Sequence, residues 1–136
     1  MKKSKKELSS EELCRVMVNG MFERKASDIV VMDLRKIHNA ITDFFVICSG
    51  SSDTQTDAIS VSVDEEVEKA SGQSPWHKEG LQNREWILLD FVDVVVHIFK
   101  KDRREFYDIE SLWGDAISYE VNEEEFVKTG NFIKQK

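Results

Sequence analysis

The residues best suited to chemistry surround a Ser-Gly-Ser-Ser turn at residues 49–52, between a predicted strand and a predicted helix. Backbone N–H groups at such a turn can hold a phosphate. A nucleotidyltransferase would add two or three carboxylates on neighbouring strands to bind Mg²⁺. Asp90 and Asp93 are three residues apart, so in a strand they point to opposite faces, and Asp93 belongs to a turn. The phosphate-transfer hypothesis therefore lacks its metal site, and a degenerate nucleotidyltransferase remains only as an alternative.

Nucleophilic catalysis has equally weak candidates. Ser49 and His97 share a predicted sheet face, with Asp43 or Asp90 as a third member, and such a trio arises easily by accident. No Gly-x-Ser-x-Gly elbow surrounds it. The other two histidines have no neighbours at metal-ligand spacing. We therefore predict a protein that is not an enzyme, with no catalytic residue, no cofactor and no metal.

Two amphipathic helices are predicted, and they would pack on the sheet that carries these residues. Ser9 and Glu12 form a capping box, and apolar residues at helical spacing then predict a helix from about residue 11 to 24. A second capping box at 52–55 opens a helix whose C-cap is Gly72.

Alternating and β-branched segments predict strands at 27–34, 43–49, 86–91 and 94–99. Val92 and Asp93 alone separate the last two, which indicates a tight hairpin. Residues 75–81 read as an irregular or edge segment, and 106–113 as a short helix or turn.

The predicted sheet has two unequal faces. One face is wholly apolar and must be covered by the helices: Phe44, Val46, Cys48, Ile87, Leu89, Phe91, Val94, Val96 and Ile98. The other face mixes aromatic and polar groups: Asp43, Phe45, Ile47, Ser49, Trp86, Leu88, Asp90, Val95, His97 and Phe99. Protein interfaces use such mixtures as anchors. The alternative is a second helix layer, with Asp90 and His97 paired in the core.

Length and charge restrict the partner. The 136 residues suit one domain at 9–114, with a flexible basic head at 1–8 and an acidic, flexible tail at 115–136. Within the tail, residues 122–129 are predicted as a marginal helix.

Residues 7–114 carry 12 basic and 21 acidic side chains, and this net negative charge disfavours a nucleic-acid partner and favours a basic protein.

Compartment signals point to the cytoplasm. Cys14 and Cys48 lie among apolar residues and are expected to be buried free thiols, as in a reducing compartment. No apolar run follows the lysines of residues 1–6 as a signal peptide requires, and no stretch is long enough to cross a membrane.

The order of these residues resembles the ribosomal silencing factor family, also called Iojap, over about residues 8–116. The motifs that carry the resemblance are Asp28-Ile29-Val30, Thr42 to Ser52 with Gln55 and Ala58-Ile59, Glu79-Gly80, Trp86 to Phe91, Val94 to Phe99, Arg104 to Tyr107 and Leu112-Trp113. Val92 departs from the glycine that the family usually has in this turn, and the tail lies outside the pattern.

The resemblance implies an α/β fold, a mixed β-sheet with helices packed on it and a nucleotidyltransferase-like topology, without known catalysis. It implies binding to the large ribosomal subunit through ribosomal protein uL-fourteen, which blocks joining of the small subunit and silences translation in starvation. It also implies a homodimer in the free state. An assembly factor for the large subunit is the alternative, since organelle relatives assist its biogenesis.

We predict the partner-binding residues on the mixed face and the adjoining segment: Asp43, Phe45, Ser49, Trp76, Lys78, Glu79, Gly80, Asp90, His97 and Phe99. Trp76 and Phe99 are the expected aromatic anchors, and the carboxylates would meet Lys and Arg of the partner. Trp76 packing on its own domain is an alternative. His97 would donate a hydrogen bond into the interface or orient Asp90.

Overall fold

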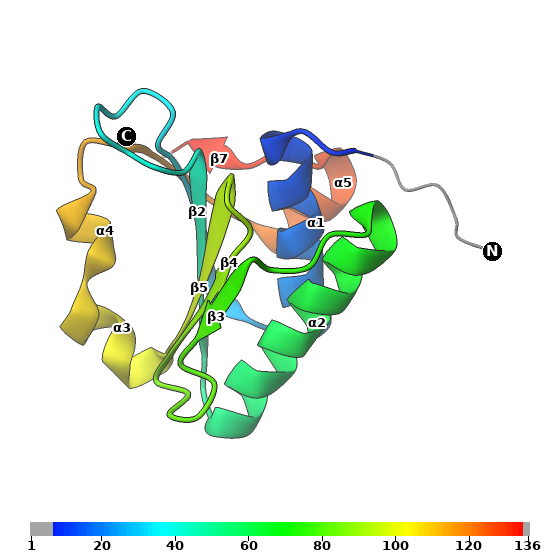
Figure 1. Cartoon of the computed structure of the whole chain (residues 1–136), viewed down its shortest axis with the longest axis vertical. Coiled ribbons are helices and arrows are strands. Elements are labelled where there is room, and N and C mark those ends of the chain that lie inside the picture. Colours follow the sequence, from blue (N-terminus) through cyan, green and yellow to red (C-terminus); the bar gives the residue numbers. More distant parts are fainter. Residues whose placement is uncertain (1–6, 135–136) are drawn as a thin grey trace.

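The fold was obtained as a computed structural model, which describes residues 7–134 (Figure 1). The predicted basic head therefore lies almost wholly outside the described residues. The helices are α1 Ser10–Glu23, α2 Asp53–Ser71, α3 Lys101–Tyr107, α4 Ile109–Leu112 and α5 Glu123–Thr129. The strands are β1 Ser27–Asp33, β2 Phe44–Gly50, β3 His77–Glu79, β4 Trp86–Asp90, β5 Val94–Lys100, β6 Ile117–Glu120 and β7 Ile133–Lys134.

Side-chain caps fix where the two long helices begin. Ser9 Oγ accepts a hydrogen bond from the Glu12 N–H at 3.1 Å, and Glu12 Oε1 accepts from the Ser9 N–H at 2.9 Å, which is the predicted capping box. Ser52 Oγ accepts from the Gln55 N–H at 3.1 Å. Gln55 Oε1, however, accepts from the Ser51 N–H at 2.6 Å. Only half of the second predicted box therefore forms.

The described strands form one mixed sheet in the order β3-β4-β5-β2-β1-β6-β7. β2 and β5 are parallel, and every other neighbouring pair is antiparallel. The strands predicted at 27–34, 43–49, 86–91 and 94–99 are the four central ones, and the segment predicted as irregular or edge contains the edge strand β3. The mixed α/β fold is confirmed.

α1 and α2 pack side by side on one face of the sheet (Figure 1). All nine residues of the predicted apolar face are buried in the core beneath them. The helices approach closely at Gly20, where a Cβ would lie 3.1 Å from the Val63 Cα, and Ser62 Oγ donates to the Gly20 carbonyl at 2.8 Å. Cys14 and Cys48 are buried free thiols, as predicted, and burial raises the pKa of Cys48 to about 12.

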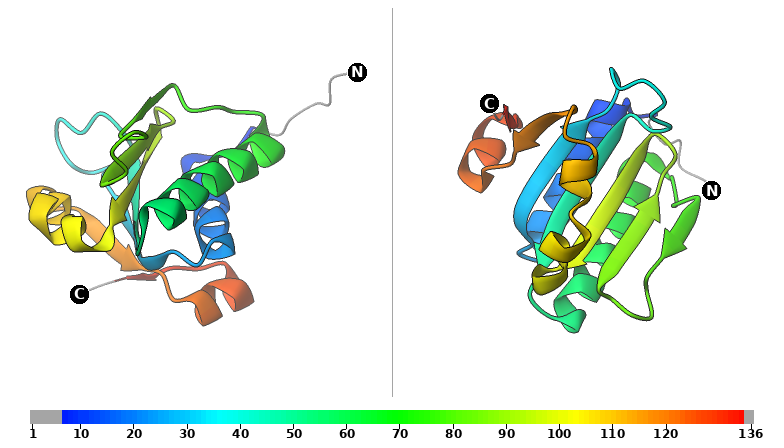
Figure 2. Two further views of the ribbon diagram at one scale, coloured as in Figure 1. Left: turned by 90° about the horizontal axis from the view of Figure 1, so that it is seen from below. Right: turned by 90° about the vertical axis from the view of Figure 1, so that its left-hand side faces the viewer.

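α3 and α4 lie on the opposite, mixed face (Figure 1). They run across its middle and leave the side of β4 and β3 uncovered by helices (Figure 2). Beneath them is a second core cluster built on Val30, Met32, Ile47, Phe99 and Ile109. The second helix layer, which the sequence left as an alternative, is therefore present over part of this face.

The C-terminal segment differs from the expected flexible tail. β6 pairs with β1 from Ile117 to Glu120, and α5 follows the Asn122 cap. Val121 and Phe126 are buried in the main core, and the Phe126 ring lies 5.8 Å from that of Phe22. Burial of these two side chains holds the segment on the domain. Among residues 7–134, no helix has the length and apolar character needed to cross a bilayer.

Candidate functional site

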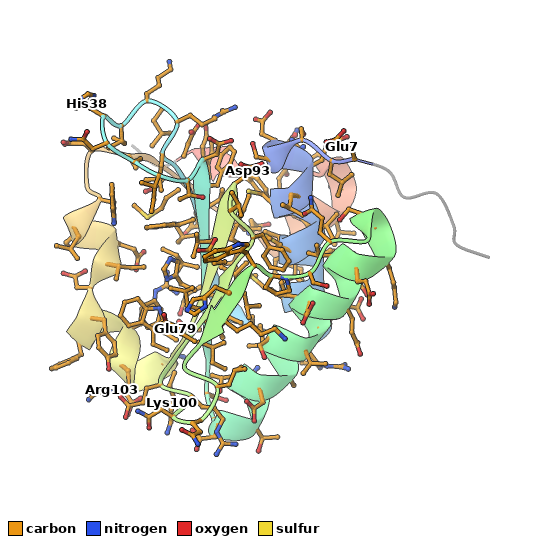
Figure 3. The ribbon with its side chains drawn as sticks, viewed as in Figure 1. Glu7, His38, Glu79, Asp93, Lys100 and Arg103 are labelled. Carbon is orange, nitrogen blue, oxygen red and sulfur yellow. The ribbon has the colours of Figure 1, made fainter. Side chains whose placement is uncertain are left out.

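The exposed part of the predicted site lies at the β3 edge of the sheet. Trp76 is 76% exposed, so the alternative that it packs within its own domain is wrong. Its backbone N–H donates to the Asp90 carbonyl at 2.7 Å, which holds the main chain at Trp76 beside the end of β4. Glu79 lies on the outer strand (Figure 3). Asp43 directly precedes β2, and Asp90 is the last residue of β4. Both are half-buried, and both lie at the end of the sheet away from Lys100.

The charged side chains of β3 point to different sides of the sheet. His77 and Glu79 pair directly across from Asp90 and Leu88, which belong to the mixed face. Glu79 Oε2 lies 2.7 Å from His77 Nε2. Lys78 points to the helix side instead, where its Nζ lies 3.0 Å from an Asp64 carboxylate oxygen of α2. Lys78 is thus placed to hold the edge strand on α2.

Gly80 has a backbone role. Its φ is +82°, and a Cβ there would lie 1.9 Å from the Trp86 carbonyl oxygen. A positive φ and so close an approach both require glycine. Gly80 therefore ends β3 and starts the turn to β4, where its own carbonyl accepts from the Arg84 N–H at 2.8 Å.

Three predicted contact residues are buried in this chain. Phe99 is 0% exposed and stacks on Trp86, with ring centroids 5.1 Å apart. Ser49 is 1% exposed, and its Oγ accepts from Arg104 Nη1 at 2.9 Å. His97 is 4% exposed. Phe99 is therefore a core residue and not the second surface anchor that we predicted, because the short helix α3 covers it.

His97 pairs with Trp86 and not, as one alternative proposed, with Asp90. Trp86 Nε1–H donates to His97 Nδ1 at 3.0 Å, whereas Asp90 Oδ1 accepts from the Val92 N–H at 2.8 Å. Burial lowers the pKa of His97 to about 3, so the ring is neutral at physiological pH. Phe45 is half-buried and meets this ring edge-on, with centroids 4.5 Å apart.

At the turn of residues 49–52, the Gln55 side chain takes donors that a phosphate would need. The Ser51 N–H is taken by the Gln55 side chain, and the same side chain donates to the Arg24 and Lys25 carbonyls at 3.0 Å. Asp53 adds a negative charge in the first turn of α2, beside Lys100 Nζ at 3.1 Å. A phosphate would have to displace the Gln55 contact. Among residues 7–134, no group of three His, Cys, Asp or Glu side chains is placed to hold a metal ion.

Two apolar side chains beside the mixed face were not among the predicted site residues. Ile41, in the loop between β1 and β2, is 96% exposed, and Trp113 meets Phe45 edge-on at 5.7 Å. Ile41 had a usable signal, since it is one of two isoleucines in the otherwise mostly polar segment 35–43. Trp113 stands in the motif Leu112-Trp113, but its contact with Phe45 depends on how α4 docks, which no local pattern shows.

Comparisons with known proteins agree on one family. The family profile described as "Ribosomal silencing factor during starvation" matches residues 7–135. The chain is 39% identical to "Ribosomal silencing factor RsfS" of Halalkalibacterium halodurans over 114 residues, 84% of this chain and 96% of that protein. It is also 39% identical to "Protein Iojap, chloroplastic" of Zea mays over 104 residues, 73% of this chain and 42% of that protein.

A crystal structure of a Chromobacterium violaceum protein has the same fold. It superposes with a TM-score of 0.74 at 31% identity, and the match covers 79% of this chain and 88% of that one.

Proposed function

The chain belongs to the ribosomal silencing factor family, and we propose that it silences translation by binding the large ribosomal subunit through its protein uL-fourteen. Bound there, it excludes the small subunit sterically and slows translation under starvation. The observation that carries the proposal is the surface position of Trp76, 76% exposed at a sheet edge that no helix covers.

The chemistry around Trp76 suits a basic protein partner. Tryptophan is enriched among the residues that dominate interface energies. Glu79 ends the edge strand that Trp76 precedes, and Asp90 lies on the neighbouring strand, where its carbonyl accepts from the Trp76 backbone N–H, so an exposed indole and two carboxylates lie near one another at this edge. Such carboxylates complement Lys and Arg and repel phosphate. Direct contact with nucleic acid is therefore a minor part of the proposal.

A regulatory protein, and not an enzyme, is what the family implies. The nucleotidyltransferase-like topology stays a prediction, and a degenerate nucleotidyltransferase is disfavoured because Gln55 occupies the turn where phosphate would bind. Calorimetric titration with Mg²⁺ and a nucleoside triphosphate separates the two, since binding at millimolar nucleotide would support the enzyme.

Two further features of the proposal follow from the family resemblance. The free protein is a homodimer, which light scattering coupled to size-exclusion chromatography measures directly. Its place of action is the cytoplasm, where it meets ribosomes. A monomeric mass at micromolar concentration would contradict the first feature, and absence from the cytosolic ribosome fraction would contradict the second.

An assembly role for the large subunit uses the same contact. Sucrose-gradient profiles of a deletion strain distinguish the two roles. Silencing predicts an excess of joined ribosomes in starved mutant cells. Maturation predicts free, incomplete subunits during growth.

The proposed contact is tested by cosedimentation with purified large subunits. Trp76→Ala should weaken binding about 30-fold, since truncating a central aromatic anchor costs about 2 kcal/mol. Val127→Ala is the matched control, because Val127 is an apolar side chain with the same 76% exposure on α5. Adding small subunits afterwards measures whether the bound protein prevents joining.

Two outcomes contradict the proposal separately. If Trp76→Ala binds as tightly as Val127→Ala, the interface lies elsewhere on the molecule. If the wild-type protein binds but joining proceeds normally, steric exclusion is wrong and the assembly role gains support.

A further inference from the structure

An edge of the sheet formed by Trp76, Glu79 and Asp90, the Trp76 edge, has no helix over it (Figure 2). Trp76 is 76% exposed, and within residues 7–134 the one aromatic ring beside its indole is that of His77, at 6.1 Å between centroids. Glu79 is exposed as well, and Asp90 is half-buried. Apolar surface is costly to leave in water, and carboxylates attract cations. The Trp76 edge therefore suits a segment that is both basic and partly apolar.

The chain holds such a segment at its own N-terminus. Residues 1–6, which lie outside the described part of the chain, hold four lysines, whereas residues 7–114 carry 12 basic and 21 acidic side chains. A lysine side chain carries its cation on a long apolar stem, so it can lie on an indole face and meet a carboxylate at the same time. Residues 1–6 therefore complement the Trp76 edge in both charge and polarity.

The two long helices bring the N-terminal segment to the end of the molecule from which this edge is reached. Gln55, in the first turn of α2, donates from its Nε2 to the carbonyls of Arg24 and Lys25, which follow α1, at 3.0 Å. α1 and α2 are therefore antiparallel, and the start of α1 lies at the same end of the helix pair as the end of α2 (Figures 1 and 2). Residue 7 approaches α1 from that end.

The N-terminal segment is long enough to reach Trp76 from there. Packed helices have axes about 8–10 Å apart. The chain from Gly72, the C-cap of α2, to Trp76 spans at most about 14 Å. The six residues before Glu7 span up to about 20 Å when extended, and the lysine stems add to that reach. The length of the segment thus matches the separation that it has to cross.

We propose that residues 1–6 dock on the Trp76 edge of their own chain, with a lysine over the indole and others beside the Glu79 and Asp90 carboxylates. Acids of α2 lie nearer to the start of α1, but two of them already have cations. Asp64 lies 3.0 Å from Lys78 Nζ, and Glu66 lies 3.4 Å from Lys69 Nζ. The exposed indole is what the Trp76 edge offers in addition to charge.

Tethering makes this weak contact count. A short linker holds its two ends at an effective concentration in the millimolar range. A contact with a millimolar dissociation constant is therefore made in about half of the molecules. The Trp76 edge is then covered for part of the time while the protein is free.

This docking regulates the same surface that the proposed function uses, and this part of the inference rests on that function. Lys and Arg of a basic partner would meet Trp76, Glu79 and Asp90, so the N-terminal segment and the partner exclude each other. With the edge covered in about half of the molecules, the partner's affinity falls about twofold. Residues 1–6 thus act as an internal competitor.

NMR of the free protein tests the docking directly. Lys3→Cys carries a nitroxide spin label, since Cys14 and Cys48 are buried and do not compete for the label. The label should broaden the indole N–H signal of Trp76 more than those of Trp86 and Trp113. At about 0.5 M salt the selective broadening should disappear, because ionic contacts at the surface are screened.

Two results of this experiment overturn the proposal. If the Trp76 signal is not selectively broadened at low salt, the segment does not dock there. If labelled protein broadens the Trp76 signal of separate, isotope-enriched molecules as strongly as its own, the segment docks on a second copy and not on its own chain.

Cosedimentation with large subunits tests the regulation. Lys→Gln at positions 2, 3, 5 and 6 should raise the affinity about twofold over a control with Lys→Gln at four exposed positions away from the edge: Lys25, Lys36, Lys101 and Lys128. Both variants lose the same charge. Adding Trp76→Ala to each should abolish the difference, because the segment then has lost its docking site.

A head variant that binds more weakly than its control overturns the regulatory role and indicates that residues 1–6 contact ribosomal RNA. Equal binding of the two variants overturns it as well. The NMR experiment uses no ribosomes, so failure of the docking and failure of the proposed function remain separate results.

Discussion

Val92 adopts a backbone conformation that its side chain opposes. At the tip of the β4–β5 hairpin its φ is 76°, in the left-handed region, where a side chain crowds the following carbonyl at a cost of about 1–2 kcal/mol. The turn nevertheless closes, because the Val92 N–H and carbonyl are held by Asp90 and Thr42. A valine at this position thus leaves the turn in place and adds strain to it.

Val92→Gly should therefore stabilise the protein by about 1 kcal/mol, since the strain is relieved at a smaller cost in unfolded-chain entropy. The side chain is 55% exposed, so little packing is lost. Val92→Ala keeps a Cβ and should gain less. Urea denaturation of the three proteins measures the difference. A loss of stability in Val92→Gly would show that the hairpin is not strained at this residue.

At the scale of single residues, the sequence best predicted which face of the sheet a side chain occupies. Alternation along the strands placed Phe99 and Trp86 on the same face, and the structure confirms that pairing. Alternation carries no information about what covers a face. The sequence therefore could not distinguish the buried Phe99 from the half-buried Phe45.

At the scale of helices and strands, the elements with strong local sequence signals were the ones that could be predicted. α1 and α2 have side-chain caps and long apolar stripes, and both begin within a residue of the predicted position. α3 has no side-chain cap hydrogen bond and buries no residue, and α4 is four residues long. Such short helices depend on tertiary docking, here through Ile109 and Trp113, which no local pattern reveals.

The same reasoning explains why β6 was missed and why α5, predicted as a marginal helix at 122–129, was expected to fray. The acidic composition after residue 115 indicates a solvated segment, yet β6 is held by pairing with β1, about 85 residues earlier in the chain. One buried aromatic, Phe126, then fixes α5 on α1. Long-range pairing of this kind does not appear in a single sequence.

Adjacent residues of α5 provide a test of this docking. Phe126→Ala should lower the free energy of unfolding by about 3 kcal/mol, because a core aromatic is removed. Val127→Ala should change it by less than about 0.5 kcal/mol, since Val127 is 76% exposed. Urea denaturation measures both. Equal, small effects would show that the segment is frayed in solution, as the sequence alone suggested.

At the scale of the whole molecule, charge is the property that selects a partner. Residues 7–114 carry 12 basic and 21 acidic side chains, while residues 1–6 hold four lysines. A field of this sign attracts a basic protein surface over about a Debye length, roughly 8–10 Å in physiological salt, and repels the phosphates of ribosomal RNA. A contact with a basic ribosomal protein and a contact with ribosomal RNA should therefore change in opposite directions when an acidic side chain is replaced by a basic one.

Glu79→Lys on the exposed edge strand uses that difference. If the partner surface is a basic protein, the association rate with large subunits should fall about threefold or more at low salt, and the difference from wild type should vanish at about 0.5 M salt. If the surface is RNA, the added lysine should speed association.

Glu65→Lys, on the exposed side of α2, makes the same change in net charge away from the edge. A rate altered equally in both variants would show that only net charge matters and that the β3 edge does not face the partner, whereas a fall confined to Glu79→Lys would place a basic surface opposite that edge.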